Sequence, residues 1–134
     1  MYHFLTLLDI PKQDLIAIVK RASELKAAPH KVNPAARKTL GMIFEKSSTR
    51  TRVAFDVAMN QMDGSSIFLT SGDSQLGRGE PLEDTARVLS RMVDIVAIRT
   101  FKHSTLETFA KYSSVPVINA LSDDFHPCQL LADL

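Results

Sequence analysis

Apolar residues along this chain follow two spacings in alternation, one typical of buried strands and the other typical of amphipathic helices. Short runs of apolar residues predict four strands, at 39–44, 65–69, 95–99 and 115–119. Apolar residues three or four positions apart, the spacing of one helix face, predict the helices. The helices are expected at 11–27, from Ser48 through Met62, at 82–93, around 106–112 and from 126 onward.

The alternation of strands with helices indicates an α/β fold. Parallel neighbours need long crossover connections, and a helix usually supplies them. We therefore expect a mostly parallel four-stranded sheet with right-handed crossovers and helices on both faces. Pro116 disfavours a central position for the start of the last strand, because proline cannot donate to a ladder. The segment 70–81 is expected to be a mobile loop, and a length of 134 residues suits one domain over 1–134.

The most informative segment is the turn at 44–52, which reads Phe-Glu-Lys-Ser-Ser-Thr-Arg-Thr-Arg. It follows a strand and opens a helix, so free N–H groups and the helix dipole favour an anion there. Ser48 is a suitable N-cap, and Thr49 and Thr51 offer hydroxyl donors. Arg50 can form a bidentate pair with phosphate oxygens. The alternative is a capped helix with two solvated arginines, which leaves the repeated Thr-Arg pair unexplained.

Further polar residues are expected at the same edge of the sheet, because ligands collect at the carboxyl ends of parallel strands. Arg99 ends an apolar strand, where a cation needs a partner or water. The alternative for Arg99 is a salt bridge to Asp94, Glu107 or Asp124. His126 and Gln129 open the last helix, where an imidazole and a carboxamide can face one ligand. A lone histidine is more often a capping or core-edge residue, but the convergence of several polar segments favours a ligand site.

Composition narrows the class of ligand. The chain is 45% hydrophobic and 23% charged, with a formal net charge of +1. Any anion site must therefore be made locally, and bulk nucleic-acid binding is not expected. No apolar stretch approaches the length of a membrane span, and no signal segment is evident. The single Cys128 suits a reducing compartment, so we expect a cytoplasmic protein.

Other chemistries find less support. The four histidines are dispersed and Cys128 has no second thiol, so no metal site is expected. The absence of a glycine-rich dinucleotide fingerprint and of a Walker loop removes support for nicotinamide and nucleoside triphosphate ligands. Cys128 as a nucleophile has no obvious base beside it other than His126. The acidic pair Glu83-Asp84 opens a helix and is better explained by compensation of the helix dipole.

Several motifs, taken together and in order, carry a resemblance to a known family. They are the turn at 44–52, the segment 73–81 with 84–89, Arg99, and the segment 126–133 that begins His-Pro-Cys-Gln. On these residues the chain closely resembles the amino-terminal, carbamoyl phosphate-binding domain of ornithine carbamoyltransferases. The resemblance covers nearly the whole chain and implies a three-layer, Rossmann-like domain.

The resemblance implies transfer of the carbamoyl group from carbamoyl phosphate to ornithine, which gives citrulline and phosphate in arginine biosynthesis. No cofactor or metal is implied. The residues implied to hold the phosphate are Ser48, Thr49, Arg50 and Thr51. Arg50 would in addition stabilise the departing phosphate.

The resemblance also assigns the residues around the carbamoyl group. Arg99 and His126 would approach its carbonyl oxygen, and Gln129 would approach its amide. Donors aimed at an oxygen that becomes negative lower the barrier to reaction. Gln75 would lie on a loop that reaches into a neighbouring subunit's site, so a homotrimer is implied.

Alternatives to an ornithine enzyme stay open. Aspartate carbamoyltransferases usually have proline before Ser-Thr-Arg-Thr-Arg and a lysine in the mobile loop, whereas this chain has Ser47 and the loop 77–81. Enzymes for putrescine or acylated ornithine are also possible. A non-catalytic module that binds a phosphorylated metabolite would not need Arg99, His126 and Gln129, and an assembly module would chiefly supply trimer contacts.

One departure from the family pattern is large. In the family, a second domain of similar size supplies the ornithine site and part of the carbamoyl site, and this chain has no such residues. We therefore expect an isolated domain or fragment that binds carbamoyl phosphate or phosphate weakly and has almost no transferase activity.

Overall fold

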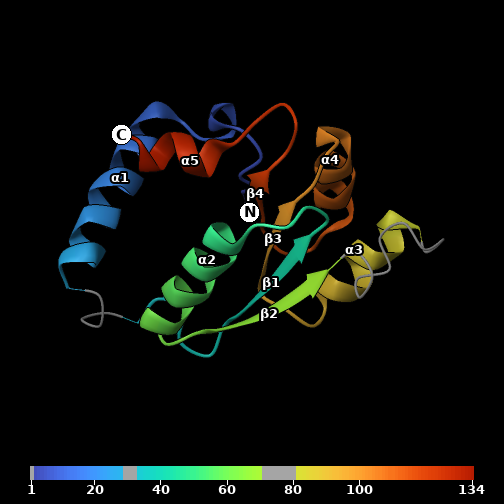
Figure 1. The fold of residues 1–134 in the computed structure, drawn as a ribbon, viewed down its shortest axis with the longest axis horizontal. Helices are drawn as coiled ribbons and strands as arrows, with labels where there is room; N and C mark the ends of the chain where they lie inside the picture. Colours follow the sequence, from blue (N-terminus) through green and yellow to red (C-terminus); the bar gives the residue numbers. More distant parts are fainter. Residues whose placement is uncertain (1, 29–32, 71–80) are drawn as a thin grey trace.

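The computed structural model describes residues 2–28, 33–70 and 81–134. Helices and strands alternate in these residues as predicted (Figure 1). The predicted loop at 70–81 lies outside the described residues except at its two ends. The elements are η1 (Leu7–Asp9), α1 (Lys12–Ala27), β1 (Thr39–Phe44), α2 (Thr49–Gln61), β2 (Ser65–Thr70), α3 (Leu82–Ser90), β3 (Ile95–Arg99), α4 (His103–Tyr112), β4 (Val117–Leu121) and α5 (Pro127–Ala132).

The strands form one sheet in the order β2-β1-β3-β4, and every neighbouring pair is parallel. This confirms the predicted α/β class and the four-stranded parallel sheet. β1 lies inside the sheet, and its residues from Leu40 to Phe44 are all buried. Continuous burial explains the unbroken apolar run in the sequence, because a strand covered on both faces has no solvent side.

Helices cover both faces of the sheet, as predicted. On one face α3 and α4 contribute Ala86 and Phe109, which pack against Ile43 of β1. On the other face α2 contributes Met59, which packs with Met42. Figure 1 shows α2 and the pair α3 and α4 on opposite sides of the strands. The side chains of β1 therefore alternate between two separate cores.

The predicted helix at 11–27 is confirmed as α1, but its apolar stripe is not buried. No residue of α1 is buried. Leu15, Val19 and Leu25 are half-buried, and Ile18 is 40% exposed. α1 lies beside α5 and away from the strands (Figure 1). Within the described residues the two cores on the sheet therefore form without this helix.

Several predicted boundaries were wrong, among them the end of α3 and both ends of β4, which runs to Leu121 rather than to 119. α3 ends at Ser90 rather than at 93, because the chain turns there to bury Val93 and leave Met92 exposed. β4 begins at Val117 rather than at 115. The Ser113 hydroxyl accepts a hydrogen bond from the Val115 N–H at 3.2 Å and donates to the Val115 carbonyl at 2.7 Å. This local turn holds Val115 out of the sheet, and Pro116 has no N–H for a ladder.

The N-terminal segment covers the outer side of β4. The Phe4 N–H donates to the Val117 carbonyl, and the Asn119 N–H donates to the Phe4 carbonyl, both at 2.8 Å. The short helix η1 that follows was not predicted. Its signal was the spacing of Thr6 and Asp9, which form a capping box. The Thr6 side chain accepts a hydrogen bond from the main chain of the turn, and the Asp9 carboxylate accepts one from the Thr6 N–H.

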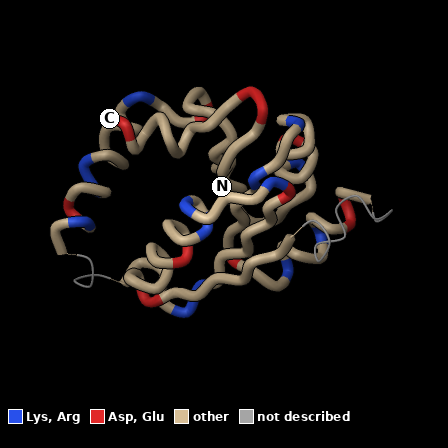
Figure 2. The backbone as a smooth tube through the Cα atoms, in the orientation of Figure 1, with Lys and Arg blue, Asp and Glu red and all other residues tan. Residues whose placement is uncertain are grey.

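Charged residues of both signs are interspersed over the described backbone (Figure 2). A field that favours an anion must then come from a local group of cations and N–H donors. None of the described helices is both long enough and apolar enough to cross a membrane.

Candidate functional site at the carboxyl ends of the strands

The sheet register brings the ends of the strands together. Phe44 at the end of β1 pairs with Thr70 of β2 on one side and with Arg99 of β3 on the other. Arg99 in turn pairs with Leu121 of β4. The polar segments that follow β1, β3 and β4 therefore start from one edge of the sheet, which is the edge where α/β proteins bind ligands.

The turn after β1 is fastened to β3 by two hydrogen bonds. The Glu45 N–H donates to the Arg99 carbonyl at 2.9 Å. The Thr100 hydroxyl donates to Glu45 Oε1 at 2.8 Å. Thr100 is buried, so this contact is shielded from water. Thr100 was missed in the sequence because no spacing distinguishes a single threonine after a strand.

Ser48 caps α2, as its sequence predicts. Its Oγ accepts a hydrogen bond from the Thr51 N–H at 3.4 Å and donates to Thr51 Oγ1 at 3.0 Å. The Arg52 N–H bonds to the Ser48 carbonyl at 3.2 Å. The N–H groups of Thr49 and Arg50 precede that bond, in the part of a helix where main-chain donors have no helical acceptor. The first turn of α2 is thus organised as an anion-binding helix start.

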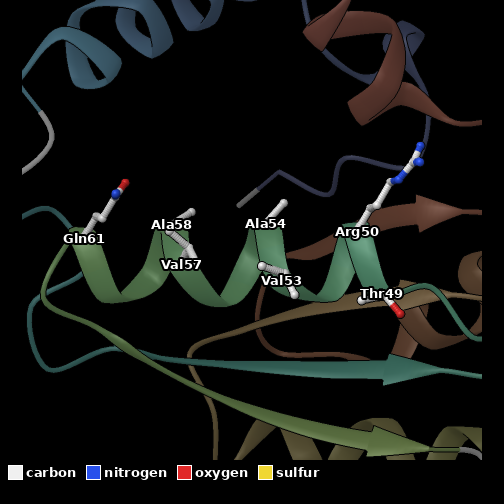
Figure 3. Close-up of a pocket in the computed structure, with 7 residues that line it drawn as sticks. All are labelled: Thr49, Arg50, Val53, Ala54, Val57, Ala58 and Gln61. Atoms are coloured by element: carbon white, nitrogen blue, oxygen red, sulfur yellow. The ribbon is translucent and has the colours of Figure 1, made fainter.

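The side chains of Thr49 and Arg50 are exposed. Figure 3 shows Arg50 at the start of α2, extended from the side of the helix that also carries Ala54, Ala58 and Gln61. Val53 and Val57 line the same shallow pocket. The arginine is therefore free to turn toward an anion at the helix start, but it makes no hydrogen bond there among the described residues.

Arg99 is half-buried at the end of β3 and lacks a full set of partners. Its Nη1 donates to Thr51 Oγ1 over a long 3.5 Å. Its Nε is buried and has no hydrogen-bond partner among the described residues. Among the described residues no carboxylate lies within ion-pair distance of Arg99. The predicted alternative of a salt bridge to Asp94, Glu107 or Asp124 is therefore not found.

Two of those acidic residues are engaged elsewhere. Asp94 accepts from the Thr39 N–H at 2.8 Å and lies 4.0 Å from Lys38 Nζ. Glu107 lies 3.7 Å from His103 Nε2. A half-buried guanidinium without a carboxylate partner is costly unless something else meets it. Arg99 is therefore available to a polar ligand.

His126 precedes α5, and its side chain makes no capping hydrogen bond. Its Nδ1 is buried and has no partner among the described residues. Partial burial and then the charge of Arg99 lower the pKa of His126 below its usual value, while Asp133 acts in the opposite direction. The lowered pKa favours the neutral imidazole of His126 at pH 7. The charge of Arg99 is one of the causes of this lowered pKa.

Gln129 and Gln75 are not joined to this group in the structure. Gln129 is exposed, and its Nε2 donates to Asp133 Oδ1 at 3.0 Å, one turn along α5. Gln75 lies outside the described residues. The structure therefore joins Ser48, Thr51 and Arg99 through hydrogen bonds. It places His126 where the charge of Arg99 lowers its pKa.

Comparison with known proteins agrees with this geometry. Residues 2–134 match the family model described as the carbamoyl-P binding domain of aspartate/ornithine carbamoyltransferase. The chain belongs to this family. It is 64% identical over 135 residues to the ornithine carbamoyltransferase of Psychrobacter cryohalolentis, a match that covers 98% of this chain and 44% of that protein. It is 60% identical to the enzyme of Nitrosococcus oceani, again covering 98% of this chain and 44% of the relative.

Solved structures of the same family have the same fold. The anabolic ornithine carbamoyltransferase of Campylobacter jejuni superposes with a TM-score of 0.94 at 53% identity, over 99% of this chain and 43% of that one. The ornithine carbamoyltransferase of Pyrococcus furiosus gives 0.92 at 45% identity, over 98% of this chain and 43% of that one. This carbamoyltransferase-family chain therefore spans less than half the length of the relatives that it matches.

Cys128, close to the site of this carbamoyltransferase-family domain, is not an activated nucleophile. Burial raises the pKa of its thiol to about 11. Its Sγ lies 3.6 Å from the Asn119 carbonyl, to which it donates. A thiol that stays protonated at neutral pH is a poor nucleophile. Among the described residues no group of three or more His, Cys, Asp or Glu side chains is placed to hold a metal ion.

Proposed function

We propose that this chain binds carbamoyl phosphate at the carboxyl ends of β1, β3 and β4. We further propose that the protein transfers its carbamoyl group to L-ornithine, forming L-citrulline and phosphate. The observation that carries the proposal is a capped helix start beside a half-buried Arg99, which has no carboxylate partner among the described residues, and a His126 whose pKa is lowered. A site for phosphate alone would need only the helix start.

Each end of the ligand would meet a different group of residues. Ser48, Thr49, Arg50 and Thr51 would hold the phosphate through hydroxyl groups, main-chain N–H groups and the guanidinium, because these suit a doubly charged anion. Arg99 and His126 would donate to the carbonyl oxygen. Gln129 would bond the carbamoyl amide after its side chain turns away from Asp133.

The reaction follows from these contacts. The amine nitrogen of ornithine attacks the carbonyl carbon, whose oxygen becomes negative in the tetrahedral intermediate. The Arg99 guanidinium and a His126 N–H would stabilise this oxygen, and losing one such donor typically costs about 10² to 10³ in rate. The bond from carbon to the phosphate oxygen would then break, the proton of the attacking nitrogen would pass to the departing phosphate, and Arg50 would balance the negative charge of that phosphate.

The choice of ornithine over aspartate, putrescine or acylated ornithine rests on the named relatives. The similar proteins cited above are ornithine carbamoyltransferases at 45 to 64% identity. A more distant neighbour is an N-acetyl-L-ornithine transcarbamylase variant in complex with carbamyl phosphate, at 31% identity and a TM-score of 0.86 over 99% of this chain and 46% of that one. Participation in arginine biosynthesis and a cytoplasmic location belong to the same proposal.

Phosphorus NMR of carbamoyl phosphate titrated with the chain tests the binding site. Wild type is expected to shift the phosphate resonance, and Arg50→Ala is expected to weaken binding about tenfold or more through loss of a charge-assisted pair. Arg91→Ala is the matched control. Arg91 is exposed at the end of α3, so its substitution removes the same charge outside the proposed site. Equal weak shifts for wild type and Arg50→Ala would contradict the site.

A homotrimer of the full-length protein is part of the proposal. β2 is at the edge of the sheet, and its Ile67 is 49% exposed, which supports a contact on that side. Sedimentation of the chain over a range of concentrations measures its assembly. A species that stays monomeric at high concentration would show that the trimer, if it forms, is stabilised by other parts of the protein.

A further inference from the structure

The segment between β4 and α5, residues 122–126, presents His126 to the site. The His126 side chain does not fix its own direction, since among the described residues its Nδ1 has no hydrogen-bond partner and it makes no capping bond. Its backbone is restricted instead, because the next residue is the buried Pro127 and a residue before proline is kept out of the helical region; its φ is −140° and its ψ is 71°. Whatever holds the main chain of Phe125 therefore holds His126.

Two buried polar side chains surround the main chain of Phe125. Asn119 is 0% exposed and Ser122 is 3% exposed. The Phe125 carbonyl accepts from the Ser122 N–H at 2.9 Å and from Asn119 Nδ2 at 3.3 Å. The Phe125 N–H donates to Ser122 Oγ at 3.2 Å. The N–H and the carbonyl of Phe125 are thus both hydrogen-bonded to groups of the buried residues Ser122 and Asn119.

Ser122 also joins this segment to α4. Its Oγ accepts from the Phe125 N–H and lies 2.9 Å from Nδ1 of His103, with which it shares a hydrogen bond. Asn119 Nδ2 has two N–H groups: one donates to the Leu5 carbonyl at 2.9 Å, and the other is shared between Ser122 Oγ and the Phe125 carbonyl, each at 3.3 Å. Ser122 is therefore bonded to Phe125 on one side and to His103 on the other.

His103 itself is placed at the start of α4 and is 9% exposed. Its ring meets the ring of Phe125 edge to face, with centroids 4.8 Å apart. Its Nε2 lies 3.7 Å from Glu107 Oε1, on the side of the ring away from Ser122. One residue of α4 thus contacts both the hydroxyl and the aromatic ring that fix the segment before His126.

We propose that Ser122, Asn119 and His103 are positioning residues that hold His126 at the carbamoyl phosphate site by anchoring the main chain of Phe125. The inference rests on the proposed function for the role of His126, but the anchoring itself does not. Loss of the Ser122 hydroxyl or of its hydrogen-bond partner on His103 frees the segment, and His126 then moves away from Arg99 into water.

The test uses the ligand-free chain and histidine NMR. In wild type the titration midpoint of His126 lies below the usual value near 6.5. Ser122→Ala and His103→Leu are expected to raise the midpoint toward that value. His103→Asn keeps a group that can form a hydrogen bond with Ser122 at the place of Nδ1, and it is expected to behave as wild type. Ser104→Ala removes an exposed hydroxyl from the same turn of α4 and is the control for Ser122→Ala.

The proposal is overturned if Ser122→Ala leaves the His126 midpoint at the wild-type value while the chain stays folded by circular dichroism. If His103→Leu does not fold, the pair Ser122→Ala and Ser104→Ala decides the question alone.

A second measurement separates this inference from the proposed function. Carbamoyl phosphate and inorganic phosphate are each added to wild type and to Ser122→Ala. Carbamoyl phosphate, but not inorganic phosphate, is expected to shift the His126 ring in wild type, and this difference should be lost in Ser122→Ala. If carbamoyl phosphate does not affect His126 in wild type, the proposed function fails, whereas the ligand-free midpoints still decide the anchoring.

Discussion

At the scale of single residues, Ser48 has two roles at the start of α2. Its hydroxyl caps the helix through the Thr51 N–H, and it lies in the turn proposed to hold phosphate. Helix stability and anion binding therefore depend on one oxygen. The sequence indicated this residue correctly because capping chemistry is local, depending only on the residues that follow within one turn.

Ser48→Ala is expected to lower the free energy of unfolding by about 1 kcal/mol, the usual cost of losing a serine N-cap. Urea denaturation followed by circular dichroism measures the change. Ser47→Ala is the matched control, since Ser47 is exposed and lies one position outside the cap. A loss of the same size in Ser47→Ala would show that the cap is not responsible.

The lowered pKa of His126 makes stability depend on pH. Burial and the charge of Arg99 favour the neutral ring in the folded chain. The unfolded chain therefore binds more protons between the lowered pKa and the usual value near 6.5, so stability falls as the pH decreases through that interval. The free energy of unfolding of wild type should decrease more from pH 7 to pH 5 than that of His126→Gln. Parallel pH profiles for the two proteins would contradict this assignment.

The direction of the Gln129 side chain shows what residue patterns cannot supply. Its position at the start of α5 follows from the sequence, but its bond to Asp133 depends on which rotamer the free helix prefers. The contact between Arg99 and Thr51 likewise joins residues 48 positions apart, so it depends on the sheet register. The sequence could place Ser48, Arg99 and His126 at the carboxyl ends of the strands, but it could not supply the hydrogen bond between Arg99 and Thr51 or the rotamer of Gln129.

At the scale of elements, the clearest success and the clearest error have physical causes. The strand at 39–44 was predicted with its observed bounds because both of its faces are buried. The start of β4 was placed two residues early because an apolar pattern does not reveal that Ser113 bonds both polar groups of Val115. A side chain that competes for main-chain groups can end a strand without any change in hydrophobicity.

The turn from α2 into β2 should be intolerant of a side chain at Gly64. A Cβ there would lie 2.6 Å from Met59 Cε and 2.9 Å from the Ala35 carbonyl oxygen. The methionine end can move, but the main-chain oxygen cannot, so Gly64→Ala is expected to cost about 1–3 kcal/mol of stability. Gly41→Ala in β1 is the control, because its Cβ would meet Val93 at an acceptable 3.4 Å. Thermal unfolding of the two variants measures the contrast, and a smaller loss for Gly64→Ala would refute it.

At the scale of the whole molecule, the described residues include hydrogen-bond donors for one proposed substrate, carbamoyl phosphate. The comparisons show that the chain corresponds to about 44% of its relatives' length. The sheet, both cores and the proposed carbamoyl phosphate contacts all belong to this part. Binding and turnover can therefore be separated experimentally.

The 134-residue chain is expected to form no measurable citrulline from carbamoyl phosphate and ornithine, although we propose that it binds the first of them. The physical reason is that catalysis needs the amine held within reach of the carbonyl carbon, and loss of such positioning can cost many orders of magnitude in rate. A colorimetric citrulline assay checks this, with the full-length Campylobacter jejuni enzyme as positive control. Turnover by the chain at a rate near that of the control would show that ornithine is bound here as well.

The position of β1 between β2 and β3 has a consequence for biosynthesis on the ribosome. The turn after β1 is fastened by Glu45, whose side chain bonds a residue 55 positions later in the chain. While the growing polypeptide still ends before that residue, β1 can pair only with β2, and one side of its ladder is open. The anion-binding turn, although it is made early, can take its final shape only after β3 has left the exit tunnel.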